Sequence, residues 1–213
     1  MKFFALAVCF CVPVASMATT ITFAGLNLGD YGIINSNLAS NANAPGAGYE
    51  EGAGWTPDVA VSMSSVNDTG LLFQPHILHW NTGYGDLTNV GFAASNGYYS
   101  RIRLDASAGY FVRLNSFDLG GWPNSDLFAQ RIRVLDGSGN ILWNQDGTMV
   151  LGANNAHSSY APNISGSSLI LEFGNNWNIG VDNINFTQEP VPEPATMTAL
   201  AIGALALIRR KRA

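Results

Sequence analysis

The stretch Arg101-Ile102-Arg103-Leu104 alternates charged and apolar side chains, and a similar alternation recurs at 110–114 and 131–134. Because successive side chains of a strand point to opposite faces, a period of two predicts strands with one buried face. We expect the apolar members to face one core: Ile102, Leu104, Val112, Leu114, Ile132 and Val134. Half-buried strands of this kind are typical of antiparallel sheets.

Further short strands are predicted on both sides of this block. They occupy residues 20–28, 59–63, 77–80, 90–92, 141–143, 169–173 and 181–186. A tight turn at 136–140 predicts a hairpin, and a long irregular loop is expected over 35–55. No part of this region has helical periodicity of useful length. Many short strands separated by Gly and Asn predict one all-β domain over 19–187, an antiparallel β-sandwich of the jelly-roll type.

Residues 1–18 are predicted to be a secretory signal peptide. Lys2 gives the positive start, an apolar stretch follows, and small residues precede the expected cleavage after Ala18. Both cysteines, Cys9 and Cys11, would leave with the signal. The exported chain would then contain no disulfide and would depend on its hydrophobic core or on bound metal.

The C-terminus divides into three parts. Residues 188–194 form a Pro-rich spacer, residues 195–208 carry no charge, and residues 209–213 contain four consecutive basic side chains. A basic cluster after an apolar helix stays on the cytoplasmic side of a membrane, so a single short transmembrane helix is predicted over 195–208. Such a helix rises only about 21 Å against roughly 30 Å of hydrocarbon, and a buried C-terminal helix of the body is the alternative.

Pro192-Glu193-Pro194, the apolar run and the basic end resemble the PEP-CTERM sorting signal of Gram-negative surface proteins. The resemblance implies processing near this tripeptide by an exosortase, which is a membrane protease, and an association with exopolysaccharide. It also implies that the chain is held in the inner membrane before processing and then reaches the cell surface or the extracellular space.

The predicted exported body, residues 19–194, is acidic. It contains fifteen acidic residues and five arginines, a net charge of −10, and it has no lysine. Binding to nucleic acid needs a basic face that neutralises phosphates, so nucleic acid is disfavoured as a partner. The acidity suits solubility and the binding of divalent cations.

A second resemblance concerns the body. Residues 112–122 and 177–186 resemble strands of galactose-binding-like, carbohydrate-binding jelly rolls, which often end on a Gly-apolar-Asp-Asn strand such as Gly180-Val181-Asp182-Asn183. The resemblance implies a structural calcium ion held by Asp182, with Asp30 or backbone carbonyls near the first strand as further ligands.

The sequence contains no motif for nucleophilic or zinc catalysis, since it has neither Gly-x-Ser-x-Gly nor His-Glu-x-x-His. His76 and His79 would point to opposite faces of a strand, and these two and His157 are predicted to be surface or loop residues. We expect no enzyme activity. Among fifteen acidic residues, however, a pair of carboxylates placed as in a glycosidase is possible, so a glycan-active hydrolase stays an alternative.

Trp122 and Trp177 lie in Gly- and Asn-rich loops, where exposed rings can stack on sugar rings, and they are the predicted sugar-binding residues. Trp80 and Trp143 lie on predicted strands and are expected to fill the core. The sequence therefore predicts an exported, non-enzymatic surface or extracellular-matrix protein associated with polysaccharide. A calcium-stabilised carbohydrate-binding module is the first alternative, and the hydrolase is the second.

Overall fold

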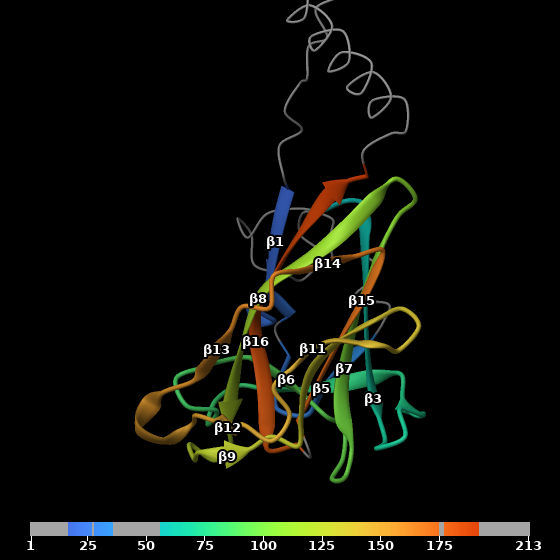
Figure 1. Cartoon of the computed structure of the whole chain (residues 1–213). Helices are drawn as coiled ribbons and strands as arrows, with labels where there is room; N and C mark the ends of the chain where they lie inside the picture. The colour runs from blue at the N-terminus through green and yellow to red at the C-terminus, as the bar shows by residue number, and fades with distance from the viewer. Residues whose placement is uncertain (1–16, 27, 36–55, 175–176, 192–213) are drawn as a thin grey trace, which may run out of the picture.

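The computed structural model describes residues 17–26, 28–35, 56–174 and 177–191, which form two antiparallel β-sheets packed against each other (Figure 1). The larger sheet has eight strands. Six of them run in the order β13 (Ser158–Tyr160), β8 (Tyr110–Gly121), β16 (Ile179–Pro190), β6 (Val90–Phe92), β5 (His76–Trp80) and β2 (Gly32–Asn35). The other two, β1 (Met17–Ile21) and β14 (Ile164–Gly166), pair with β16 and β8.

The smaller main sheet has six strands. Their order is β11 (Ile141–Asn144), β10 (Arg131–Asp136), β15 (Ser168–Gly174), β7 (Tyr99–Ala106), β3 (Val59–Val66) and β4 (Leu72–Gln74). A two-stranded sheet joins β9 (Leu127–Phe128) to β12 (Met149–Val150), and two short 3-10 turns occur, η1 (Ala24–Leu26) and η2 (Ala153–Asn155).

The predicted all-β antiparallel sandwich is confirmed, and the alternating stretches form its centre. Residues 101–104, 110–114 and 131–134 lie in β7, β8 and β10. The six apolar side chains that were expected to share one core are each at most 1 % exposed. They pack between the sheets with Phe117, Phe173 and Phe186, so the period of two correctly gave the buried face. The jelly-roll connectivity stays a prediction.

The prediction for the first strand, 20–28, is wrong in its bounds. The strand ends at Ile21, and the chain turns at Phe23, whose φ is 56°. The ring of Phe23 is fully buried, and it lies close to the backbone of Gly91 on β6. A left-handed φ ends an extended strand, so the next residues form the turn η1 instead.

The two ends of the described chain lie side by side, as the blue start of β1 and the red end of β16 show in Figure 1. Met17 pairs with Gln188, and Ala18 pairs with Thr187. Strand β16 continues to Pro190, and Gln188 is buried against Asp58. The sandwich therefore extends beyond the predicted 19–187, and the first three residues of the predicted spacer 188–194 belong to its central strand.

Several predicted features fall outside the described residues. They are most of the signal peptide, the greater part of the loop 35–55, the Pro192-Glu193-Pro194 tripeptide and the predicted span 195–208. Within 17–26, 28–35, 56–174 and 177–191, no helix has the length and apolar character that a membrane crossing requires.

Candidate functional site

A loop at residues 81–89 covers the face of the larger sheet that points away from the core. The sheet beneath it carries glycines, because a side chain there would collide with the loop. A Cβ on Gly120 would lie 2.2 Å from the Tyr84 carbonyl oxygen, and one on Gly180 would lie 2.9 Å from Tyr84 Cδ1. The loop is closed by Asn89 N–H, which donates to the Asn81 carbonyl at 2.9 Å. Two sites form along this loop, one polar and one aromatic.

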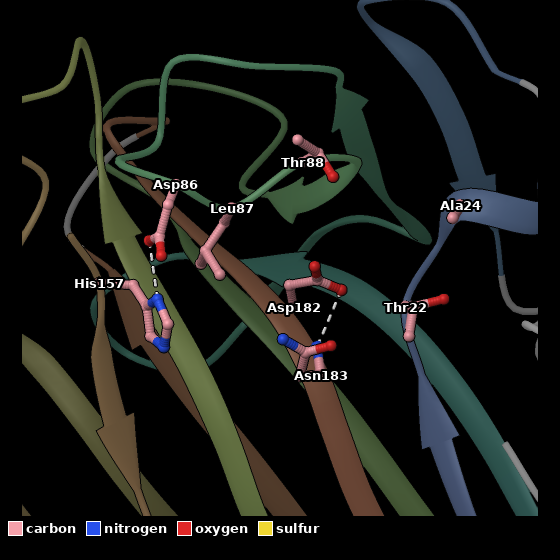
Figure 2. A pocket seen from close by; sticks show the side chains of 8 residues that line it. All are labelled: Thr22, Ala24, Asp86, Leu87, Thr88, His157, Asp182 and Asn183. Atoms are coloured by element: carbon pink, nitrogen blue, oxygen red, sulfur yellow. Dashed lines mark hydrogen bonds and ion pairs between the residues drawn. The ribbon is translucent and has the colours of Figure 1, made fainter. Parts of the chain in front are cut away.

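The polar site is a cavity of about 320 Å³ between the loop and the sheet, here called the polar cavity (Figure 2). Polar side chains provide most of its lining. The lining residues are Thr22, Ala24, Asp86, Leu87, Thr88, His157, Asp182 and Asn183. In Figure 2, Asp86 and His157 point toward each other at one end of the cavity, and Asp182 and Asn183 project from β16.

A β-bulge explains why consecutive residues of β16 both reach the polar cavity. In a regular strand, Asp182 and Asn183 would point to opposite faces. The register between β16 and β8 shifts after Asp182, and Asn183 has a φ of 51°, so one extra residue is inserted. The inward alternation then resumes with Ile184, which is fully buried in the core.

Hydrogen bonds hold the carboxylates around the polar cavity in place. His157 Nδ1 lies 2.7 Å from Asp86 Oδ1, and His157 Nε2 lies 3.7 Å from Asp118 Oδ1. Asn183 Nδ2 donates to Asp118 Oδ2 at 2.8 Å, and Asp182 accepts the backbone N–H of Asn183. Asp118 is directly opposite Asp182 in the sheet, so two carboxylates meet where an amide and an imidazole can offset their repulsion.

The aromatic site, here called the aromatic cluster, lies at the other side of the loop. It contains Tyr31, Trp80, Tyr84, Phe92, Trp122 and Trp177. The ring centroids of Trp122 and Trp177 are 4.6 Å apart, and those of Trp80 and Trp122 are 6.3 Å apart, both edge-on. Tyr31 packs edge-on against Trp80 at 4.9 Å and is 64 % exposed.

The structure thus brings the two predicted sugar-binding residues together and adds four other aromatic side chains, Tyr31, Trp80, Tyr84 and Phe92. Trp122 and Trp177 are half-buried against each other, while Tyr31 presents the exposed ring. The prediction that Trp80 fills the sandwich core is wrong, because Trp80 packs on the outer face of the sheet. Trp143 does pack against the core, 6.1 Å from Phe117.

The hydroxyl group of Tyr84 fastens the loop to the strand end that carries Trp177. It donates to the Trp177 carbonyl oxygen at 2.5 Å. Burial, with a smaller contribution from Tyr31, raises the pKa of Tyr84 above its ordinary value, so the fold holds the neutral phenol.

We therefore expect Tyr84→Phe to lower the free energy of unfolding by about 1–3 kcal/mol at pH 7, because the partly buried Trp177 carbonyl loses its donor. The sign of the pH effect follows from the raised pKa. Stabilisation by the neutral phenol is complete below the unfolded-state pKa of about 10 and is lost progressively above it. Urea unfolding at pH 7 and pH 11 should show a smaller alkaline loss in Tyr84→Phe than in the unmutated protein. An equal loss in both would contradict the assignment.

Of the two predicted calcium ligands, Asp182 and Asp30, only Asp182 lines the polar cavity. Asp30 does not line the polar cavity; its Oδ1 accepts hydrogen bonds from the backbone and side chain of Asn81, each at 2.9 Å. Within the part of the chain that the structure describes, no group of three or more His, Cys, Asp or Glu side chains is arranged to hold a metal ion. A calcium ion held by Asp182 with backbone carbonyl groups stays a prediction.

The histidines differ from one another more than the sequence indicated. His79 lies on β5, is fully buried, and has Nδ1 3.2 Å from the Gly29 carbonyl oxygen, so its prediction as a surface or loop residue is wrong. His76 and His79 do lie on opposite faces of β5, since they alternate between half-buried and buried positions. His157 lies in a loop, as predicted, and it is the histidine that lines the polar cavity.

The end of β16 leads directly into the segment that matches a known family. A family model described as the PEP-CTERM protein-sorting motif matches residues 190–212, starting at the last residue of β16. The chain carries a PEP-CTERM sorting motif. This motif implies export and membrane-associated sorting by an exosortase. Comparison of the chain with curated proteins gave no match.

The predicted processing residues stand at one end of the sandwich or just beyond it. Ala18 is paired within β1, next to the strand that ends at the sorting motif. Pro192, Glu193 and Pro194 lie inside the matched range but outside the described residues. The last described residue, Val191, donates its backbone N–H to the Gly109 carbonyl at 2.8 Å. The folded body therefore reaches to the edge of the sorting motif.

Proposed function

We propose that this exported protein is a non-enzymatic surface or extracellular-matrix protein whose body binds neutral polysaccharide. The observation that carries the proposal is that one loop, 81–89, forms a polar cavity on one side and an aromatic cluster on the other. Sugars present hydroxyl groups at their edges and C–H groups on their faces. Carboxylates and amides bind the former, and aromatic rings pack against the latter.

The polar groups of the cavity suit hydroxyl-bearing ligands. The carboxylates of Asp86 and Asp182 accept hydrogen bonds from hydroxyl groups, and such charge-assisted bonds are strong. Thr22 also lines the cavity, and its buried hydroxyl has no hydrogen-bond partner among the described residues. Because the cavity wall and the whole body are acidic, an acidic polysaccharide would be repelled.

The aromatic cluster adds a surface for a sugar face. Tyr31 is its exposed member; it packs edge-on against Trp80, which in turn packs edge-on against Trp122. Because the rings of Trp122 and Trp177 pack against each other, replacing either one would disturb the fold as well as the aromatic cluster. Tyr31 is therefore the better residue with which to test stacking.

Affinity electrophoresis of the full chain in gels that contain dextran, a soluble β-glucan or alginate would test the proposal. We expect retardation by a neutral polysaccharide and not by alginate. Asp86→Asn, Asp182→Asn and Tyr31→Ala should each weaken the binding at least tenfold with an unchanged melting temperature. Asp136→Asn, in the β10–β11 turn, is the matched control and should bind normally.

Two outcomes would overturn this proposal. If the unmutated protein is not retarded by either neutral polysaccharide, the body is not a glycan-binding domain of this kind. If reducing sugar is released from the bound polysaccharide, the protein is an enzyme, and the glycan-active hydrolase takes the place of the binding function.

A further inference from the structure

One end of the sandwich carries both ends of the described chain and the first two residues of the matched sorting motif. Here it is called the anchoring end, and it consists of Met17, the turn 107–109 between β7 and β8, and Val191. Met17 pairs with Gln188 on β16, and the backbone N–H of Val191 donates a hydrogen bond to the Gly109 carbonyl in the turn. Figure 1 shows the start of β1 and the end of β16 at the same end of the molecule, with β9 and β12 at the other.

The join between the body and the apolar tail is short. Strand β16 ends at Pro190, and only residues 191–194 separate it from the uncharged run, which begins at Ala195. Four residue steps span at most about 14 Å when fully extended. A tail held at a membrane therefore keeps Val191 and the turn beside it within that distance of the start of the apolar run.

The chemistry of the anchoring end permits such closeness. The turn consists of Ser107, Ala108 and Gly109, which are exposed and uncharged, and the flanking Phe111 is 38 % exposed. An uncharged surface with an aromatic side chain suits the membrane interface, whereas the rest of an acidic body would be repelled by anionic lipid.

The acidic side chains nearest this end have partners within the body. Glu189 accepts from Arg113 Nε at 2.6 Å, and this bond holds the pKa of Glu189 below its ordinary value. Asp58 exchanges two hydrogen bonds with Gln188, each at 3.0 Å. These contacts also hold the last residues of β16 in the sheet, so the strand end cannot lengthen the join without breaking them.

We infer that the anchoring end faces the lipid bilayer while the chain is attached through its sorting motif. The sandwich then stands with β8 running away from the membrane and the antiparallel β16 running toward it. The polar cavity and the aromatic cluster lie on the face of the larger sheet that points away from the core, and this side of the molecule is exposed to solvent. The inference rests on the membrane-associated sorting that the motif implies and does not depend on glycan binding.

Energy transfer to a labelled lipid headgroup would test the orientation. The full chain, with Cys9→Ser and Cys11→Ser, is placed in vesicles of phosphatidylethanolamine and phosphatidylglycerol. A donor is attached at Ala108→Cys in the turn or, as the matched control, at Met149→Cys on β12, which is 47 % exposed. The twelve residues of β8 separate the two ends of the sandwich by roughly 37 Å. We expect transfer from position 108 to be at least threefold stronger than transfer from position 149.

A second variant shows whether the short join is the cause. Ten Gly and Ser residues inserted between Val191 and Pro192 add up to about 35 Å of reach, and the difference between the two positions should then disappear. Equal transfer from both positions in the chain without the insertion would overturn the orientation. A difference that survives the insertion would overturn the role of the join.

Discussion

Replacing Glu172 by alanine is expected to lower the free energy of unfolding by about 3–5 kcal/mol, because the substitution removes a buried carboxylate that three partly buried arginines share. Glu172 lies on β15, and its side chain is 3 % exposed. It forms ion pairs with Arg101 on β7 and, at 3.4 and 3.5 Å, with Arg131 and Arg133 on β10. Three of the five arginines of the body therefore share this one carboxylate, although Arg133 also lies 3.9 Å from Asp146.

The loss should come mainly from the charge. Glu172→Gln keeps the size of the side chain and part of its hydrogen bonding, so it should still show most of the destabilisation. Asp105→Ala is the matched control, since its ion pair with Arg103 joins side chains that are 41 % and 39 % exposed. Exposed pairs contribute less than about 1 kcal/mol. Urea unfolding of the three variants would decide the matter, and a loss of similar size at positions 105 and 172 would refute the argument.

The sequence indicated the strand that carries Glu172 but not the ion pairs. Residues 169–173 are apolar except for this glutamate, and a period of two places it on the opposite face from Leu171 and Phe173. The partners follow from register, which sets Glu172 opposite Arg101 on one side and Arg133 on the other. Register between distant strands depends on the whole assembly, and a local pattern does not contain it.

The sequence did not predict that loop 81–89 covers the outer face of the larger sheet, and the reason is a different one. Alternation shows which residues share a face, but it does not show whether the second face is also covered. Strand β5 illustrates this limit, because His79 has the parity of Ile77 and could have been assigned to the core, whereas Trp80 faces loop 81–89. That loop has no period, and its docking depends on the absence of a side chain at Gly120.

The sequence indicated some residues of the candidate sites one at a time, and the fold brings them together. Trp122 and Trp177 are far apart in the sequence, and they meet because Trp122 N–H donates to the Asn178 carbonyl at 2.8 Å. Asp182 was singled out through its Gly-apolar-Asp-Asn strand, but its neighbours Asp86 and His157 come from loops with no recognisable motif. The bulge at Asn183 could not be predicted from the sequence. In a regular strand the Asn183 side chain would point to the face opposite Asp182 and would not reach the polar cavity.

The same bulge connects the core to the polar cavity, and Phe117 occupies the position opposite the inserted residue. Phe117 is fully buried, with its ring 5.3 Å from Tyr160 in a stacked arrangement and 6.1 Å from Trp143. Its neighbour on β8 is Asp118, which receives the hydrogen bond from Asn183 on the other face of the sheet. A substitution of Phe117 therefore lies next to Asp118, which holds Asn183 at the polar cavity.

We expect Phe117→Ala to lower the free energy of unfolding by about 3–5 kcal/mol, because it removes a large buried ring and leaves a cavity between the sheets. Phe128→Ala is the matched control: Phe128 is 64 % exposed, and its loss should change stability by no more than about 0.5 kcal/mol. Urea unfolding of both variants measures the difference directly. If the two substitutions have equal effects, position 117 does not lie in the principal core, and the packing of the two sheets against each other would have to be rejected. Because the polar cavity rests on the strand that Phe117 supports, that result would also remove the structural basis for the proposed glycan site.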